Sequence, residues 1–525
     1  MYDKEHQKIS WEWLQWRIIQ LLAVGLVCSA LFFHWNPAAL SVLPALAEPE
    51  VEETSKTITI FVSGFSPQRV ALVPGDEVTW QNATTETVNL YSGWPKEQYI
   101  PLVSLDSGGS SQLAAVKLKP AFQLPELIVT LPPGGSFSQQ FPRDGRFLFH
   151  TDTISPYLNA IVVGDRDRDR LPDDVETNDG NFIDDTRTGT DPDNPDTDSD
   201  GILDGDEILG TEDGLDLPAL GANPLRKNIF IEYDWLEYND SEETYIHRPM
   251  PESLARISQV FRDAPIKNPD GSTGISLHHD YGQGNGFHEG NLIPDADGVL
   301  AGDILNGEFV SYKAAHFDDN RLGFFHYVIL AHRFGSTDPP PSGLAELRGD
   351  DMIISLQDSH DNIDFLAAAI MHELGHNLGL DHGGDSPCNF KPNYNSIMNY
   401  RFEFFGIDDR SCDAEGDGVA VNLDYSEGNR LTLDETNLNE IVGVCGTQPI
   451  DFNDNGIINN PIVPVIFDVN FYDRELSECG GLLTTLSDYN DWASIDLTAL
   501  TEENNLRTAP RLIEEASLAE LTQRD

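Results

Sequence analysis

Apolar and polar residues alternate in short runs between residues 57 and 164. Runs of this kind, at 57–62, 78–80, 147–149 and 160–163, are separated by turns rich in glycine and proline. Alternation with a period of two is typical of strands that bury one face, and the turns mark strand ends. We therefore predict a small β-sandwich of about 100 residues in this region.

The pattern changes from residue 226 onward, where strand-like and helix-like stretches alternate. The expected strands are 228–233, 274–278, 324–331 and 351–356. Residues 252–263 and 362–380 have the apolar spacing of helices. This alternation predicts an α/β domain with a mixed sheet over 226–496. Residues 497–525 are assigned to a polar C-terminal tail in which we recognise no chemistry.

The N-terminus has the layout of a secretory signal peptide. Three basic residues precede an apolar stretch at 18–35, and the small-residue sequence Ala45-Leu46-Ala47 follows. The stretch is also near the length that spans a bilayer, so an uncleaved signal anchor stays open. We assign 1–47 to a signal peptide or signal anchor and 48–56 to a linker. Both alternatives predict a secreted or cell-surface protein.

Charge narrows the classes of partner. The 525 residues include 32 Lys and Arg and 88 Asp and Glu, for a net charge of −56. A chain this acidic lacks the clustered cations that bind nucleic acid or anionic lipid. We therefore expect no nucleic-acid partner, membrane contact only through an uncleaved N-terminal segment, and a monomer.

Four of the five cysteines lie in the C-terminal half, and Cys28 lies in the N-terminal apolar stretch. In an exported protein an even set of cysteines indicates two disulfides. Three pairings of Cys388, Cys412, Cys445 and Cys479 are possible. The pairing that we favour joins Cys388 to Cys412 and Cys445 to Cys479.

Acidic residues recur at fixed spacing between 165 and 225. Two twelve-residue loops carry carboxylates at positions 1, 3, 5, 9 and 12: Asp165, Asp167, Asp169, Asp173 and Glu176 in the first, and Asp196, Asp198, Asp200, Asp204 and Glu207 in the second. Oxygen ligands at alternate positions wrap a calcium ion, and a final glutamate can bind it with both oxygens. Gly201 supplies the tight turn in the second loop, whereas the first has Arg170 there. A solvated acidic linker is the alternative to calcium binding.

The acidic loops and the predicted β-sandwich each resemble a known family. The acidic loops, with the intervening residues 189–195, resemble thrombospondin type 3 calcium repeats, which implies a stiff calcium-dependent spacer. The sandwich resembles a cupredoxin domain through residues 65–67 and 74–82. A blue-copper site needs two histidines and a cysteine. Residues 48–225 contain no cysteine and one histidine, His150, so we expect a sandwich without copper.

The second predicted helix ends in the sequence His-Glu-Leu-Gly-His-Asn-Leu-Gly-Leu-Asp-His, which begins at His372. His372 and His376 are four residues apart, so they lie on one helical face and can bind one zinc ion. Gly379 permits a sharp turn that would bring His382 back as the third ligand. Three protein ligands leave a fourth position for water, as catalytic zinc requires. Glu373 is placed to act on that water.

Residues 395–400 follow with the sequence Asn-Ser-Ile-Met-Asn-Tyr. Together with the zinc motif, they resemble the metzincin metalloendopeptidases of the bacterial secreted type. The resemblance is specific over about 372–400. It implies that Met398 forms a hydrophobic floor under the zinc site and that Tyr400 lies near the metal.

The resemblance also implies a reaction and a mode of substrate binding. Glu373 would be the general base for a zinc-activated water, and Tyr400 would donate a hydrogen bond to the developing oxyanion. Peptide substrates would lie extended along an edge strand, either 351–356 or a neighbour.

Two functions stay open at this stage. We expect a secreted zinc endopeptidase that acts on protein or peptide substrates, with structural calcium. The alternative is a calcium-dependent adhesive or structural surface protein whose peptidase site is vestigial, although an intact Glu373 argues against it. Residues 48–226 contain no cysteine, so inhibition of the zinc site by a cysteine from an N-terminal propeptide is excluded. Inhibition by an acidic residue, or through cover of the site by the sandwich, stays possible.

Overall fold

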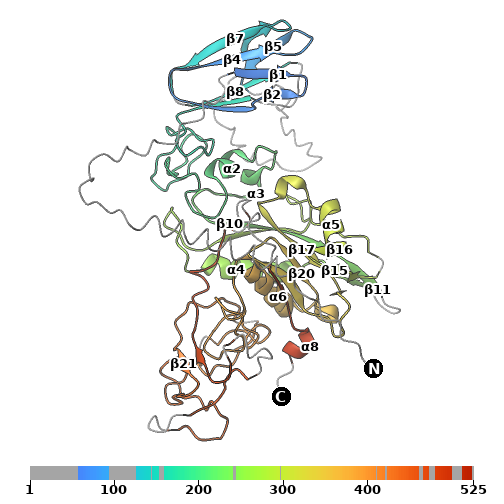
Figure 1. The fold of residues 1–525 in the computed structure, drawn as a ribbon, viewed down its shortest axis with the longest axis vertical. Coiled ribbons are helices and arrows are strands. Elements are labelled where there is room, and N and C mark those ends of the chain that lie inside the picture. The colour runs from blue at the N-terminus through green and yellow to red at the C-terminus, as the bar shows by residue number, and fades with distance from the viewer. Residues whose placement is uncertain are drawn as a thin grey trace, which may run out of the picture. The chain divides into compact units, whose positions relative to one another are not determined.

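The structure is a computed structural model, shown in Figure 1. It describes residues 57–93, 126–143, 145–152, 159–239, 244–295, 297–408, 411–419, 422–459, 465–471, 479, 481–498, 500 and 511–522. The predicted signal peptide or anchor and the linker lie outside these residues. Within them, no helix combines the length and apolar character needed to cross a membrane.

The alternating N-terminal region forms two β-sheets, as predicted. One has the order β2-β1-β4-β7 and the other β3-β9-β8-β5-β6. The bounds are β1 Thr57–Phe61, β2 Gly64–Ser66, β3 Arg69–Leu72, β4 Asp76–Asn82, β5 Val88–Ser92, β6 Glu126–Leu131, β7 Ser136–Phe141, β8 Gly145–Thr151 and β9 Asn159–Val163. The core centres on Trp80, whose ring lies 4.7 Å from that of Phe149 and whose Nε1 donates to Asn159 Oδ1 at 2.9 Å.

The acidic region between the sandwich and the α/β domain is mostly irregular. It contains two short helices, α2 (Asp204–Leu209) and α3 (Leu217–Leu220). Close packing of the two acidic loops requires a glycine at position 205. A Cβ atom there would lie 1.7 Å from the Asp169 carbonyl oxygen.

The predicted α/β domain is built on a six-stranded mixed sheet with the order β13-β10-β17-β20-β19-β23. The first four strands are parallel to one another, and β19 and β23 add antiparallel pairings. The bounds are β10 Asn228–Trp235, β13 Ser276–Asp280, β17 Phe325–Leu330, β19 Gly343–Leu347, β20 Asp351–Ile354 and β23 Arg511–Glu514. Four of these strands match the predicted ones.

Hydrophobic clusters cover both faces of this sheet. Ile229 and Ile231 of β10 belong to the cluster that contains helices α4 (Pro251–Asp263) and α6 (Ile363–Asn377). Phe230, between them, belongs to the cluster on the opposite face. The two helices pack together, as Figure 1 shows. Because both faces are covered, β10 is buried along its whole length.

The remaining elements are short. They are β11 Glu237–Asn239, β12 Thr244–Ile246, β14 Val299–Leu300, β15 Gly302–Asp303, β16 Asn306–Gly307, α5 Glu308–His316, β18 Arg333–Phe334, β21 Leu433–Asp434, β22 Thr485–Leu486 and α8 Leu518–Leu521, with 3-10 turns at Asp319–Arg321 and Gln357–Ser359.

The prediction of a separate C-terminal tail over 497–525 is wrong for residues 511–522. These residues supply β23, which pairs with β19, and α8, whose Leu518 and Leu521 lie in the same buried cluster as α6. The sequence argument missed them because a four-residue strand and a four-residue helix carry too little periodicity to stand out.

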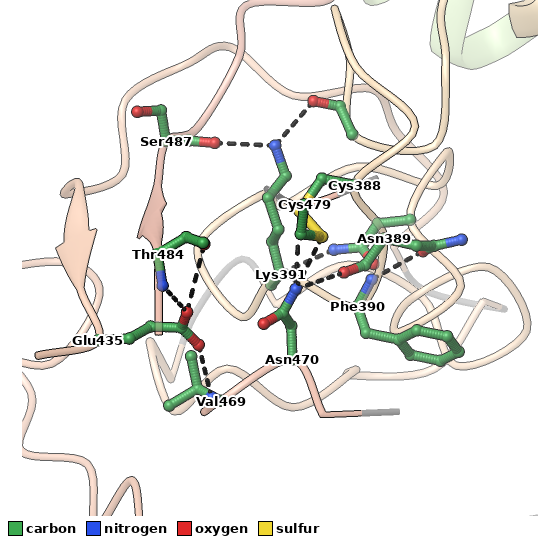
Figure 2. The surroundings of a disulfide bond; sticks show 12 residues. Cys388, Asn389, Phe390, Lys391, Glu435, Val469, Asn470, Cys479, Thr484 and Ser487 are labelled. Atoms are coloured by element: carbon green, nitrogen blue, oxygen red, sulfur yellow. Dashed lines mark hydrogen bonds between the residues drawn. A yellow bond between two sulfur atoms is a disulfide. The ribbon is translucent and has the colours of Figure 1, made fainter. Parts of the chain in front are cut away.

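The preferred disulfide pairing is also wrong. Cys388 is bonded to Cys479, and Cys412 to Cys445. Figure 2 shows the first bond in a region where side chains hold the backbone: Lys391 Nζ donates to the Ser487 carbonyl, and the Glu435 carboxylate accepts from the Thr484 and Val469 amides. Pairing follows from how irregular segments meet, which cysteine spacing does not encode.

Candidate metal centre

Helix α6 positions the first two histidines. The Asn362 side chain accepts hydrogen bonds from the Asp364 and Phe365 amides at 3.0 and 3.2 Å and so caps the helix start. Burial then continues along the helix, and both His372 and His376 are 0% exposed. The i,i+4 spacing predicted that their rings share one helical face, and they do, with Nε2 atoms 3.1 Å apart.

Backbone carbonyls orient both rings. His372 Nδ1 lies 2.9 Å from the Ile397 carbonyl oxygen, and His376 Nδ1 lies 2.7 Å from that of Leu380. A carbonyl only accepts hydrogen bonds, so each Nδ1 carries a proton and each Nε2 faces the site, where its lone pair can bind a metal. Histidines that ligate metals are held in this way.

The third histidine arrives through the predicted turn. Gly379 has φ +94°, which a glycine adopts without strain, and the chain leaves the helix there. The ring centroid of His382 lies 5.4 Å from that of His372 and 4.9 Å from that of His376. The three predicted zinc ligands therefore converge.

A fourth side chain completes this group, and it was not predicted. The Glu515 carboxylate lies 3.2 Å from His376 Nε2, 3.1 Å from His382 Nε2 and 3.4 Å from His372 Nε2. It is 4% exposed and follows directly after β23. No signal in the sequence marks it, because it lies 133 residues beyond His382.

The donor set fits a zinc ion. Four atoms bound to tetrahedral zinc at about 2.0–2.1 Å lie about 3.3–3.4 Å from one another. The His372 and His376 Nε2 atoms are 3.1 Å apart, each of the three Nε2 atoms lies 3.1 to 3.4 Å from a Glu515 oxygen, and all ligand atoms of the group lie within 4.8 Å of one another. Two Nε2 lone pairs 3.1 Å apart also repel each other unless a cation or proton lies between them.

Glu373 lies beside this group and against the sheet. It is 1% exposed, and its Oε2 has no hydrogen-bond partner among the described residues. Its Oε1 is so close to β19 that a Cβ atom at Gly343 would lie 1.8 Å from it. Burial, together with the nearby Glu515 and Glu403 carboxyls, raises the pKa of Glu373 well above its usual value.

Met398 and Tyr400 both lie close to the histidine group. Met398 is fully buried, and its sulfur would lie 2.2 Å from a Cβ atom at Gly375, so it packs directly against α6 between the two helical histidines. The Tyr400 ring lies 4.4 Å from that of His382, and its hydroxyl accepts from the Ala516 amide at 3.3 Å. Burial and the adjacent Glu515 raise the pKa of Tyr400, so it stays protonated.

A second buried carboxyl near the site, Glu403, was also missed. It is 1% exposed, and its Oε2 has no hydrogen-bond partner among the described residues. Burial raises the pKa of Glu403 to about 8, and the charge of His372 opposes the shift. Its place five residues after Met398 gave no motif from which to predict it.

The acidic loops gather three groups of carboxylates. Two groups are those of a single loop, Asp165 with Asp167 and Asp169, and Asp196 with Asp198 and Asp200. The third joins the loops, because Asp204 of the second lies with Asp169 and Glu176 of the first. Buried carboxylate oxygens without hydrogen-bond partners among the described residues indicate that a cluster can bind a cation. In the two loops such oxygens belong to Asp167, Asp169, Glu176, Asp198 and Glu207.

Burial next to other carboxylates raises the proton affinity of these groups. It raises the pKa of Asp169 to about 7 and the pKa values of Glu176 and Asp198 to about 9. A different acidic cluster, which contains Asp350 and Asp351, already holds the ammonium group of a lysine. Clustered, buried carboxylate oxygens without hydrogen bonds are what a hard cation such as calcium would satisfy.

Several predicted ligands of the loops accept hydrogen bonds from other residues. The Asp173 carboxylate accepts from Arg166 Nε at 2.7 Å and belongs to none of the three groups. Glu207 Oε1 accepts from Asn228 Nδ2 at 2.8 Å, while its Oε2 has no partner among the described residues. Asp200 Oδ2 accepts from the Asn228 amide at 2.6 Å, which connects the second loop to the first residue of β10.

Comparisons with known proteins concern about a fifth of the chain. No family model matches, and no curated protein matches. The solved structures to which it is similar include a purple cupredoxin from Nitrosopumilus maritimus (18% identity, 20% of this chain, 97% of that chain, TM-score 0.13). Two others are mutants of amicyanin: a methionine-to-alanine mutant in the Cu(I) form (15% identity, 20% and 79% coverage, TM-score 0.14) and an oxidized proline-to-glycine mutant (14% identity, 22% and 89% coverage, TM-score 0.15).

These structural neighbours are cupredoxins, at low TM-score. Scores of this size establish neither the fold of the whole chain nor the metal that it binds. In the sandwich, the Nδ1 atom of His150 lies 2.8 Å from the Gly93 carbonyl oxygen. Because the comparisons carry no argument about zinc, calcium or a metzincin domain, those predictions depend on the residues described above.

Proposed function

We propose that the protein is an exported zinc-dependent endopeptidase. One observation carries this proposal: three histidine Nε2 atoms converge on the Glu515 carboxylate at 3.1 to 3.4 Å, a spacing compatible with a shared zinc ion, and Glu373 is buried beside them. Two disulfides within the described residues are compatible with a compartment outside the cytoplasm.

Each side chain has a role in this proposal. His372, His376 and His382 would hold zinc, which supplies Lewis acidity toward a water molecule and a peptide carbonyl when bound. Glu373 accepts the proton of the attacking water and returns it to the leaving amine. The Tyr400 hydroxyl keeps its proton and can donate to a developing oxyanion.

The proposal includes calcium in the acidic loops. Its support is the set of buried carboxylate oxygens without hydrogen-bond partners in both loops. The contacts of Asp200 and Glu207 with Asn228 give calcium a structural role next to the central sheet.

A non-catalytic surface protein is the second candidate, and one observation favours it. Four protein ligands close a zinc site, and closed sites are typical of structural zinc. The buried carboxylate of Glu373 favours the peptidase, since a structural site has no use for a base with an unpartnered oxygen.

The deciding experiment is cleavage of a peptide library by four forms of the full chain: wild type, Glu515→Ala, Glu515→Ala with Glu373→Gln, and Glu515→Ala with Glu252→Gln. Glu252 is an exposed helical glutamate and serves as the matched control. We expect about one zinc per chain in all forms. We expect cleavage by Glu515→Ala and its Glu252 control, and a loss of about 100-fold or more with Glu373→Gln. Zinc-loaded Glu515→Ala that cleaves no peptide would refute the peptidase.

A further inference from the structure

The C-terminal strand lies where the sequence analysis expected a peptide substrate. β23 pairs antiparallel with β19, placing Leu344 opposite Glu514 and Ala345 opposite Ile513. Without β23, β19 would be the edge strand of the central sheet. An extended peptide that adds to such an edge is a common mode of peptide recognition.

The pairing continues past β23 into the metal centre. The Glu515 amide donates to the Gly343 carbonyl at 3.1 Å, and the Ser342 amide donates to the Ala516 carbonyl at 3.1 Å. Gly343 is the residue whose backbone lies against Glu373. The backbone register therefore delivers the Glu515 side chain to the histidines.

Contacts on both sides hold this segment in place. Arg511 Nη1 lies 2.7 Å from Asp381 Oδ2, next to His382. On the other side, Leu518 and Leu521 are buried in the cluster that contains α6. The segment is thus docked by charge, backbone pairing and apolar burial, and not by Glu515 alone.

We propose that residues 511–517 are a built-in inhibitor of the metal centre, in which Glu515 takes the fourth zinc position and β23 takes the place of a peptide substrate. This inference rests on the proposed function. A catalytic zinc keeps one position for water, and the Glu515 carboxylate fills that position. Activity then requires this segment to leave β19.

The segment inhibits and is not a bound substrate, because of the group that it presents. The atoms that approach the histidine Nε2 atoms belong to the Glu515 side chain, which contains no peptide bond. The neighbouring Ala516 carbonyl is held by the Ser342 amide and by its hydroxyl at 2.9 Å. Glu515 also occupies the Tyr400 hydroxyl, the group available to an oxyanion.

The test is access of an external ligand to the metal. The full-length protein is loaded with Co(II), and its visible absorption is titrated with acetohydroxamic acid in wild type, Glu515→Ala, Glu515→Gln and Glu514→Gln. Glu514 is the exposed neighbour in the same strand and serves as the control. We expect both Glu515 variants to bind acetohydroxamate about tenfold or more tightly than wild type and the Glu514 variant. Equal binding by wild type and the folded Glu515 variants would overturn the proposal.

Other readouts separate this inference from the proposed function. Hydrogen exchange at the 343–347 amides should be faster in Glu515→Ala than in wild type, because the segment leaves β19 more often once the Glu515 carboxylate no longer holds it at the metal centre. If the Glu515 variants admit acetohydroxamate but cleave no peptide, the blocking role stands and the peptidase is wrong. If wild type cleaves peptides as fast as Glu515→Ala, the peptidase stands and the inhibitor is wrong. Failure of wild type to bind Co(II) or zinc overturns both.

Discussion

The two kinds of candidate metal site in this chain are built in opposite ways. Two of the three acidic groups draw their carboxylates from a single twelve-residue stretch and the third joins the two stretches, and like charges face each other in all three. The histidine centre draws its groups from a helix, a turn and a strand 133 residues further on. It combines three imidazoles with one carboxylate.

The difference lies in how each site is stabilised without its ion. The loops leave buried carboxylate oxygens without hydrogen bonds, so their folded form depends on a cation or on bound protons. The histidine rings are held by the Ile397 and Leu380 carbonyls, and Glu515 lies against all three Nε2 atoms. We therefore expect metal removal to destabilise the loops far more than the histidine centre.

Calcium removal should have the largest effect. Two sites saturated at about 100 times their Kd would contribute about 5 kcal/mol together, which chelation removes. The raised pKa values of Asp169, Glu176 and Asp198 mean that the calcium-free folded chain binds more protons than the unfolded chain. Its stability should therefore fall as pH rises from about 4 to about 9, and the benefit of calcium should grow over that range. Thermal unfolding with calcium or EGTA at pH 5.5 and 8 measures both effects; a calcium effect that shrinks with pH would contradict this account.

Removing one zinc ligand should come next. His382→Ala should weaken zinc binding by about 100-fold or more, because the remaining groups no longer enclose the ion. His360→Ala is the control, since His360 is a buried histidine whose ring packs 4.3 Å from that of His247 and which lies outside the metal group. Competition with a chromogenic chelator measures the affinity, and equal zinc affinities for the two variants would rule out His382 as a ligand. Thermal unfolding should change less than it does on calcium removal.

Within the loops, Glu207 and Asp173 should behave differently although the spacing treats both as ligands. Glu207→Gln should weaken calcium binding by about tenfold, because it removes a buried charge from the second loop. Asp173→Asn should change it little, since that carboxylate is engaged by Arg166. Isothermal titration with calcium distinguishes the two variants. A larger loss of calcium affinity in Asp173→Asn than in Glu207→Gln would contradict this prediction and would mean that spacing alone identifies the ligands.

The smallest expected effect tests whether the second loop is coupled to the sheet. Asn228→Ala removes the side-chain bonds to Asp200 and Glu207 and should reduce the stabilisation by calcium by about 1 kcal/mol. Asn239→Ala, at the exposed last residue of β11, is the control. If both variants respond equally to calcium, the loop acts independently of β10.

Sequence spacing was informative where the interacting residues are near in the chain. The i,i+4 rule placed His372 and His376, and the glycine rule placed the turn at Gly379. It did not find Glu515, because an antiparallel pairing between β19 and a distant strand leaves no periodic trace. The predicted disulfide pairing was wrong for the same reason, because Cys388 is bonded to Cys479, which lies 91 residues further along the chain.

The region around Figure 2 has a consequence for how this protein tolerates substitution. Between residues 388 and 491 the described chain has only two strands of two residues each, and amides and carboxylates such as Asn393, Glu435 and Asp491 bind its backbone instead. Substitutions such as Asn to Ser or Glu to Gln, which most protein surfaces tolerate, would here remove the side-chain hydrogen bonds that hold the backbone in place. A deep mutational scan should thus find polar positions in this region as intolerant as the apolar positions of β10.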